Sequence, residues 1–273
     1  GETVYLEHRS LGGIVLLDST KIASNGSFKL KGDLFQNPEF YQLRVNNKIA
    51  VFTVDDDNKE IVVHADLNNL TKTFKVDNSI YNDQIHSIDE MTSNAKKQID
   101  ALEKLHSSKQ LDDVEYLNSI DTILIDYKSD LTKIILGDPS GPAAYYAVFQ
   151  KINNYLIFDP YDKQDYAMYG AVATSWDKRY SETERSKHLY DFTMNALKTR
   201  KQQEKQSEFI ENATVITDSS LPDISLKEVS GKNISLQSLK GKVVVLDFTV
   251  YNSEFSPKHN IDLNNLYSSI KSQ

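Results

Sequence analysis

Apolar residues change their spacing along the chain and divide it into three regions. From Val4 to Phe74 the pattern consists of short β-rich runs separated by turn residues, namely VYL, GIVLLD, FYQLRV, IAVFTV and IVVHA. Asn25-Gly26 suits a two-residue hairpin turn that needs positive φ, and the run FKL follows it. The spacing predicts an antiparallel sheet or small β-sandwich over residues 1–77.

Residues 78–213 carry apolar residues at helical spacing. Two stripes with steps of three and four predict two long antiparallel helices: Ile85, Ile88, Met91, Ala95, Ile99, Leu102 and Leu105, then Leu117, Ile120, Leu124, Tyr127, Leu131 and Ile134. The second stripe stops at Gly137-Asp138-Pro139, which is a helix stop signal. Pro142 opens a third helical segment, and a fourth begins at Arg185.

An aromatic run lies inside this helical region. It contains Tyr155, Phe158, Tyr161, Tyr166, Tyr169 and Trp176, the single tryptophan of the chain. Such rings can line a binding groove. They also fill the joints between helices, where they bury much apolar area. Packing is the better interpretation of this run.

Residues 214–273 return to turns and short apolar runs. LPDISL precedes Gly231-Lys232, and ISL and LKGK lead into the apolar run from Val243 to Phe248. The pattern predicts a turn, a short strand, a second turn and a buried apolar strand. A helix then follows, with one apolar face formed by Ile261, Leu263, Leu266 and Ile270.

The run PDISLKEVSGKNISLQSLKGKVVVLDF resembles the opening of the redoxin branch of the thioredoxin superfamily. This branch holds thiol-disulfide interchange proteins and relatives of the alkyl hydroperoxide reductase and thiol-specific antioxidant (AhpC/TSA) type. The resemblance implies the N-terminal part of a thioredoxin-like α/β domain in residues 214–273. The expected fold class is therefore α+β and multidomain, with an N-terminal antiparallel β-sandwich, a central helical region and an incomplete thioredoxin-like domain.

Two serines occupy the positions where that family has its Cys-x-x-Cys motif. The motif works at a helix N-terminus, where the first cysteine has a lowered pKa and attacks a substrate disulfide as a thiolate. The resemblance places Ser253 and Ser256 at these positions. A serine hydroxyl is far less acidic and forms no disulfide, so the reaction does not transfer. The predicted role of Ser256 is helix capping, because Pro257 suits a first helical position.

Two functional interpretations stay open. The first is a non-catalytic envelope protein with a binding or scaffolding role. The second is a thiol-disulfide oxidoreductase or peroxidase-like antioxidant relative that this chain represents in a cysteine-free or truncated form. Thr249, Glu254 and Phe255 stand where the family has Trp and Gly-Pro. Two engineered serine substitutions would not produce those further differences.

The composition excludes several classes of chemistry. The chain has no cysteine, which removes thiol nucleophiles, disulfides, thiolate metal ligands and Fe-S clusters. The 31 Lys and Arg residues against 39 Asp and Glu residues give a net charge of -8, which disfavours nucleic acid and anionic membrane surfaces. No apolar run approaches the roughly 20 residues of a transmembrane helix. We expect no cofactor.

No catalytic or metal-binding group stands out among the polar residues. The six histidines do not cluster in the sequence at metal-ligand spacing, so no metal site is expected: they are His8, His64, His86, His106, His188 and His259. Ser256 and His259 are three residues apart and suggest a nucleophile and a base. The sequence offers no third member, so neither residue is assigned a catalytic role.

The front of the chain carries a second resemblance. VYLEHR, GIVLLDST, NGSFKLKG and YQLRV resemble a domain of unknown function that often precedes redoxin modules in cell-envelope proteins of Gram-negative bacteria. This implies a periplasmic or envelope location, with a lipid anchor upstream of Gly1 in many such proteins. The expected partners are an envelope protein or peptide and a second copy of the chain. Homodimer formation is expected because an incomplete parallel sheet leaves unpaired edges.

Overall fold

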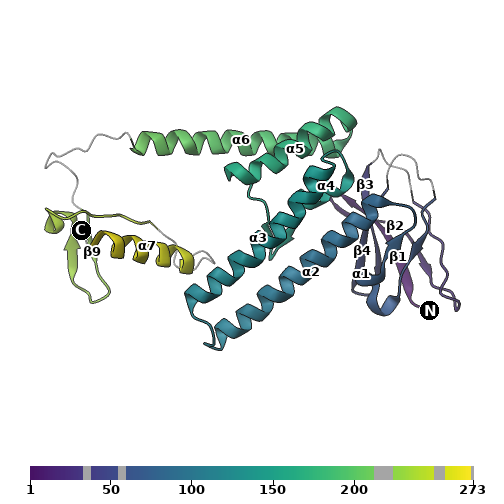
Figure 1. The fold of residues 1–273 in the computed structure, drawn as a ribbon, viewed down its shortest axis with the longest axis horizontal. Helices are drawn as coiled ribbons and strands as arrows, with labels where there is room; N and C mark the ends of the chain where they lie inside the picture. Colours follow the sequence, from purple (N-terminus) through teal and green to yellow (C-terminus); the bar gives the residue numbers. More distant parts are fainter. Residues whose placement is uncertain (33–37, 55–59, 212–223, 249–255, 272–273) are drawn as a thin grey trace. The chain divides into compact units, whose positions relative to one another are not determined.

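The computed structural model describes residues 1–32, 38–54, 60–211, 224–248 and 256–271. The chain divides into two compact units, residues 1–205 and 206–273. The β-rich region and nearly all of the predicted helical region lie in the first unit (Figure 1). The predicted α+β layout, with an antiparallel sheet followed by helices, is confirmed.

The N-terminal sheet has four antiparallel strands in the order β2-β1-β3-β4. Their bounds are Thr3–Ser10 for β1, Gly13–Lys21 for β2, Glu39–Val45 for β3 and Lys48–Val54 for β4. Asn46 has a φ of 54° in the turn between β3 and β4, a conformation that asparagine tolerates. Gly26 has a φ of 83° after β2, as the Asn-Gly signal predicts, but the following FKL run forms no strand.

Each face of this sheet packs against a different layer. Strand alternation places Val4, Leu43 and Phe52 on one face. Short elements cover that face: β5 (Val63–His64), η1 (Leu67–Asn69), α1 (Leu70–Thr73) and β6 (Lys75–Val76). Phe40 lies on the opposite face and packs against the helices, where its ring stacks on those of Tyr145 and Tyr146.

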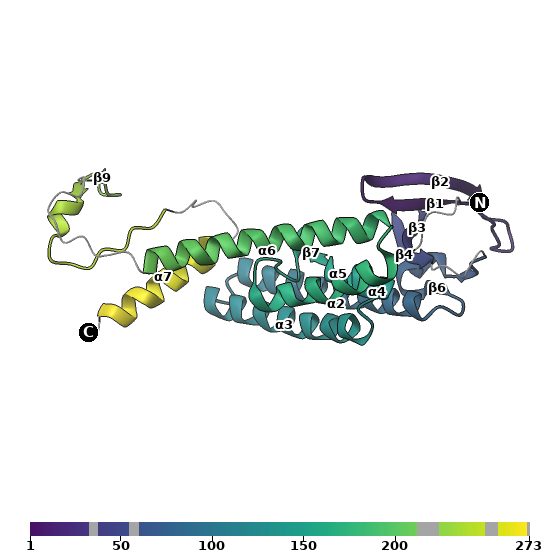
Figure 2. The same cartoon turned by 90° about the horizontal axis from the view of Figure 1, so that it is seen from above.

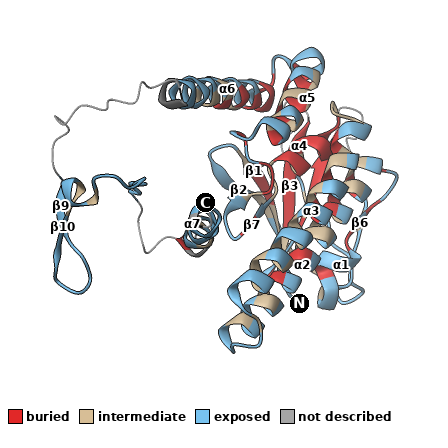
Figure 3. Ribbon diagram, turned by 60° about the vertical axis from the view of Figure 1, so that its left-hand side comes forward, coloured by how far each residue is buried: buried red, intermediate tan, exposed pale blue. Residues whose placement is uncertain are grey.

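Five helices make up most of the rest of the first unit, and the last of them, α6, continues past residue 205, where that unit ends (Figures 1 and 2). They are α2 (Ile80–Ser107), α3 (Asp113–Gly137), α4 (Pro142–Val148), α5 (Lys163–Tyr180) and α6 (Glu184–Glu211). Burial of Ile85, Ile88, Ala95 and Ile99 in α2 and of Tyr127 and Leu131 in α3 confirms the core of both predicted stripes. Leu105, at the end of the first stripe, is exposed. Figure 3 shows buried positions along the facing sides of α2 and α3.

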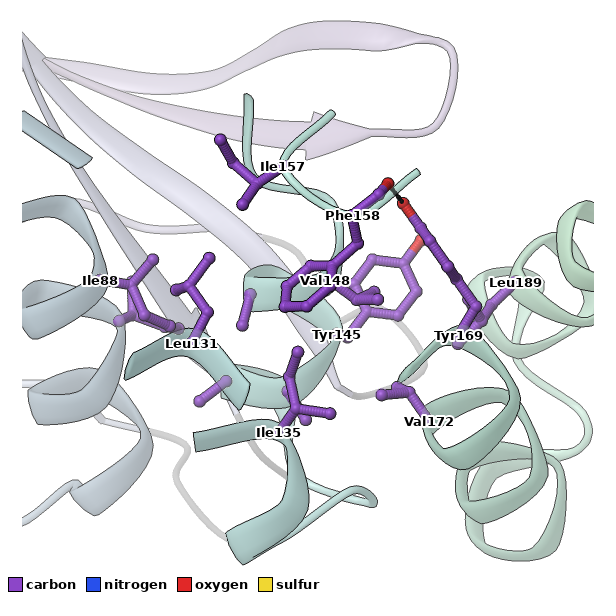
Figure 4. Packing of buried hydrophobic residues seen from close by; sticks show 14 of the residues in the cluster. Ile88, Leu131, Ile135, Tyr145, Val148, Ile157, Phe158, Tyr169, Val172 and Leu189 are labelled. Carbon is purple, nitrogen blue, oxygen red and sulfur yellow. Dashed lines mark hydrogen bonds between the residues drawn. The ribbon is translucent and has the colours of Figure 1, made fainter. Parts of the chain in front are cut away.

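The core of the helical part is dense in aromatic rings. Tyr169, Phe158 and Trp176 are fully or almost fully buried, and the Tyr169 hydroxyl donates to the carbonyl of Phe158 at 2.9 Å (Figure 4). Packing is thus the role of these three rings, whereas Tyr155 and Tyr161 are exposed. Tyr155 begins β8 (Tyr155–Leu156), which pairs with β7 (Lys151–Ile152).

The β7–β8 hairpin is absent from the sequence prediction. Asn153 and Asn154 form its turn with φ values of 50° and 67°. A pair of asparagines between two short apolar runs is a signal for a two-residue turn with positive φ at both positions. The sequence analysis predicted helices throughout residues 78–213 and therefore missed this turn.

The C-terminal unit contains a small hairpin and one helix. Strands β9 (Ser225–Lys227) and β10 (Asn233–Ser235) pair antiparallel, and η2 (Leu236–Leu239) follows. Gly231 and Gly241 have φ values of 85° and 88°, so both predicted turns need glycine. The helix α7 covers Ser256–Lys271.

The prediction of a buried strand at residues 243–248 is wrong. These residues form no strand, and Val243 and Phe248 are 86% and 89% exposed. A buried parallel strand needs a neighbour on each side and helices over both faces. Within the described part of the C-terminal unit, β9 and β10 pair only with each other, so nothing pairs with this run.

Asn82 of α2 closes one edge of the N-terminal sheet. Its side-chain oxygen accepts from Thr53 N at 2.7 Å, and its amide nitrogen donates to the Thr53 carbonyl at 3.0 Å. Both backbone groups of this β4 residue are therefore satisfied as a neighbouring strand would satisfy them. The Thr71 hydroxyl also donates to the carbonyl of Ile49, at 3.3 Å.

We predict that Asn82→Ala lowers the free energy of unfolding by about 1–3 kcal/mol, because it leaves the buried N–H and C=O of Thr53 unpaired. Urea denaturation monitored by circular dichroism measures the change. Asn94→Ala, on the exposed face of the same helix, is the matched control and should stay within about 0.5 kcal/mol of the parent. Equal effects of the two substitutions would contradict the role assigned to Asn82.

Candidate functional site

The strongest concentration of buried charge lies where the N-terminal sheet meets the helices. Glu7 of β1 is 5% exposed, and its carboxylate accepts from Arg44 Nε at 2.8 Å and from Gln42 Nε2 at 2.6 Å. Arg9 Nη1 donates to the other end of the Gln42 amide at 2.6 Å. Strand alternation brings these four side chains to one face of the sheet because β1 and β3 are paired in register.

Hydrogen bonding holds Glu7 in its ionised form. Burial alone would raise the pKa of Glu7, but the hydrogen bonds from Arg44 and Gln42 and the charge of Arg44 outweigh that effect. The pKa therefore lies below the ordinary value of 4.5. Arg44 also covers the ring of Tyr5, with its guanidinium carbon 4.2 Å from the ring centroid.

A second charged cluster ties helix α6 to the sheet. Arg185 at the start of α6 is 5% exposed, and its Nε donates to Glu39 Oε2 at 2.8 Å. The same carboxylate oxygen lies 2.8 Å from His8 Nε2. Arg185 also donates to the backbone carbonyl of Arg9. Its guanidinium lies over the Phe40 ring, 4.9 Å from the centroid.

Asp89 and Tyr146 form a third polar contact beside these clusters. The Tyr146 hydroxyl donates to Asp89 Oδ1 at 2.6 Å. Burial raises the pKa of Asp89 above its ordinary value of 3.8, and the Tyr146 hydrogen bond and the charge of Arg9 offset only part of this. Burial and the adjacent Asp89 raise the pKa of Tyr146 well above 10. A partly buried carboxyl with a raised pKa is a signal that accompanies functional sites and structural networks alike.

Histidines pair singly with carboxylates instead of gathering into a metal site. The pairs are His8 with Glu39, His64 with Asp77, His86 with Glu90, His106 with Asp113 and His259 with Asp247. Among the described residues there is no group of three or more side chains that could hold a metal ion. Of these pairs, His86 and Glu90 are separated by four residues on one helix, a spacing at which side chains meet.

The structure describes one of the two serines that the resemblance places at the cysteine positions. Ser253 lies outside the described residues. Ser256 is buried and is itself the first residue of α7, so the helix begins one residue earlier than predicted, where Pro257 was expected as its first residue. Helix ends assigned by hydrogen bonding commonly differ by one residue from a capping argument. The serine still stands at the N-terminus of the helix.

The structure brings Asp247 to His259, a contact that the sequence analysis missed. His259 Nε2 lies 2.9 Å from Asp247 Oδ2, and both side chains are partly exposed. A separation of twelve residues matches neither the helical nor the strand period, so the sequence pattern gives no signal for this contact. The contact joins α7 to the extended run at residues 243–248.

Comparison with known families assigns the front of the chain only. Residues 1–85, which cover the sheet and the start of α2, match a family described as a domain of unknown function (DUF4369). Comparison with curated proteins gives no match, and comparison with solved structures gives none. No helix among the described residues has the length and apolar content to cross a membrane.

We predict that Arg185→Met lowers the free energy of unfolding by about 3–5 kcal/mol, because Glu39 is then left buried without its cationic partner. Chemical denaturation measures the effect. The double variant Glu39→Gln, Arg185→Met should recover part of the loss. Lys187→Met, an exposed change on the same helix, should have little effect. A double variant no more stable than the single one would show that the charge of Glu39 is not the cause.

The raised pKa of Asp89 predicts a pH trend in stability. The folded protein holds this proton more tightly than the unfolded chain, so the stabilising contribution is complete below pH 3.8 and is lost as pH rises through the folded pKa. Asp89→Asn should therefore gain stability relative to the parent as pH rises over that window. Tyr146→Phe should move the loss to higher pH, because it removes a hydrogen bond that lowers this pKa. Parallel stability curves for the parent and Asp89→Asn would contradict the assignment.

Proposed function

We propose that this chain is a thioredoxin-like protein of the cell envelope that carries no thiol chemistry and acts in binding or scaffolding. The observation that carries the proposal is the complete absence of cysteine, with serine at both positions that the resemblance aligns with the redox-active motif. A thiolate is required to attack a disulfide or a peroxide, and no residue of the chain supplies one.

The local order of elements supports the thioredoxin-like part of the proposal. In the described residues 224–248 and 256–271, a hairpin and a short 3-10 helix precede the apolar run and the helix α7, although the strand that the resemblance implies for that run does not form. Two glycines with positive φ stand at the turns, Gly231 and Gly241. The proposal for the cell envelope rests on the resemblance of the front region alone.

The polar groups of the first unit support binding over catalysis. Glu7, Glu39 and Arg185 are neutralised by each other or by neighbouring side chains, so they hold the sheet to the helices. A general base needs a free lone pair within reach of a substrate proton. The expected partner is an envelope protein or peptide, and nucleic acid is disfavoured by the net charge of -8.

The redox part of the proposal is tested with the full-length chain. Insulin reduction by dithiothreitol and peroxide consumption should proceed at the uncatalysed rate, because no thiol is present to turn over. A cysteine-containing thioredoxin is the positive control. Measurable turnover by the chain would sink the proposal and favour an oxidoreductase or antioxidant of the redoxin family.

The resemblance itself is tested by the double variant Ser253→Cys, Ser256→Cys. If the helix N-terminus has a thioredoxin-like arrangement, the two cysteines should form a reversible disulfide, and the first should react with iodoacetamide well below pH 8.5 because of its lowered pKa. Ser268→Cys, at the far end of the same helix, is the control for an ordinary thiol. Identical reactivity of both proteins would remove the support for a thioredoxin-like segment.

A further inference from the structure

The two edges of the N-terminal sheet differ in how their backbone groups are satisfied. At the β4 edge, Asn82 and Thr71 take the place of a neighbouring strand. At the opposite edge, β2 pairs with β1 and with no other described strand. The Lys31 amide donates to the Asp18 carboxylate at 2.8 Å, and Gly32 lies against the Leu17 side chain, so among the described residues the open stretch of this edge runs from Gly13 to Leu16.

This open stretch is apolar and contains no charged residue and no proline. Ile14, Val15 and Leu16 are 53%, 48% and 56% exposed. Exposed edge strands are usually guarded by lysine, proline or an inward-pointing charge, because their free N–H and C=O groups invite pairing with another chain. Residues 13–16 contain none of these residues. The β-bulge of this strand, another feature that limits edge pairing, lies at Leu17, just after the stretch. Three consecutive exposed apolar side chains on an open sheet edge are typical of a surface that pairs with another chain.

We propose that the β2 edge pairs antiparallel with the β2 edge of a second copy of this chain, with Val15 of each copy opposite Val15 of the other. The sheet of the dimer would then have eight strands. The proposal uses the first unit only and is independent of the thioredoxin resemblance, so the redox assays and the association measurements can fail separately.

Symmetry restricts the register of such a pair. In a two-fold antiparallel pairing the symmetry axis is perpendicular to the sheet, and each side chain stays on its own face. Residues that oppose one another lie on the same face, so the centre of the pairing falls on a residue and never between two residues. The candidate centres in the exposed stretch are therefore Ile14, Val15 and Leu16.

Only the centre at Val15 matches every exposed apolar side chain with another. It places Ile14 opposite Leu16 of the second copy and Val15 opposite Val15. A centre at Ile14 would place Val15 and Leu16 opposite glycines. A centre at Leu16 would carry the pairing across the β-bulge at Leu17, where the regular alternation of β2 is interrupted. A second copy thus fits this edge in a single register.

The faces of the paired strands follow from the existing register with β1. Ile14 is opposite Arg9 and Leu16 is opposite Glu7, whereas Val15 is opposite His8. In the dimer, Ile14 and Leu16 of both copies form an apolar group of four side chains on the face that carries Glu7 and Arg9. Val15 and its symmetry mate meet on the other face. Cross-strand pairs of β-branched residues stabilise such a ladder.

The first experiment is a charge exchange at the centre. Sedimentation equilibrium of the full-length parent should show a reversible dimer over a concentration series. Val15→Lys and Val15→Glu should each weaken self-association at least tenfold, because like charges then oppose one another. An equimolar mixture of the two variants should restore the dimer. Ile125→Lys, a change at an exposed residue of α3, should dimerise like the parent.

The second experiment uses the absence of cysteine from the chain. Val15→Cys introduces a single thiol, which should form a disulfide-linked dimer under mild oxidation because opposed residues bring their Cβ atoms to within about 5 Å. Ile125→Cys should cross-link far more slowly. A monomeric parent at every concentration would overturn the proposal. Failure of the Lys and Glu variants to associate with each other, or equal cross-linking of the two cysteine variants, would overturn the Val15 register.

Discussion

Arg185 brings a positive charge into the joint between sheet and helices, and three elements depend on the contacts it makes. Its guanidinium donates to Glu39 of β3 and to a carbonyl of β1, and it lies over the ring of Phe40. Tyr145 of α4 lies on the same guanidinium, with its centroid 5.6 Å away. An unpaired charge at this depth would cost several kcal/mol, so the sheet, α4 and α6 are held in the one arrangement that satisfies it.

This joint explains why the two faces of the sheet differ. One face is apolar and is covered by short elements that follow it directly in the chain. The other carries Glu7, Arg9 and Arg44 beside Phe40, so helices pack on part of it and paired charges occupy the remainder. The two edges of the sheet also differ, because a helix covers only one of them. Helix α2 crosses the β4 edge and supplies Asn82, whereas no described strand or helix pairs with the outer edge of β2 between Gly13 and Leu16.

The candidate site was far less predictable than the fold. Glu7, Glu39 and Arg185 are separated by up to 178 positions, and no spacing in the sequence connects residues whose contact is made across a sheet and a helix N-terminus. The contact between Asp247 and His259 was not predicted either, because their spacing in the chain follows no helix or strand period. The β7–β8 hairpin is a different case, because its Asn153-Asn154 turn is a local signal that could have been read.

The sequence by itself determined the local structure: β-strands and their Asn and Gly turns, the long helices with their apolar stripes, and the loss of thiol chemistry through the absence of cysteine. These features depend on period, on backbone conformation and on residue type, all of which are properties of neighbouring residues. Only the tertiary structure decided that Val243 to Phe248 stays unpaired, which charges meet, and which sheet edge is closed. Strand pairing and burial of charge require a partner distant in the chain, and the sequence pattern carries no record of that partner.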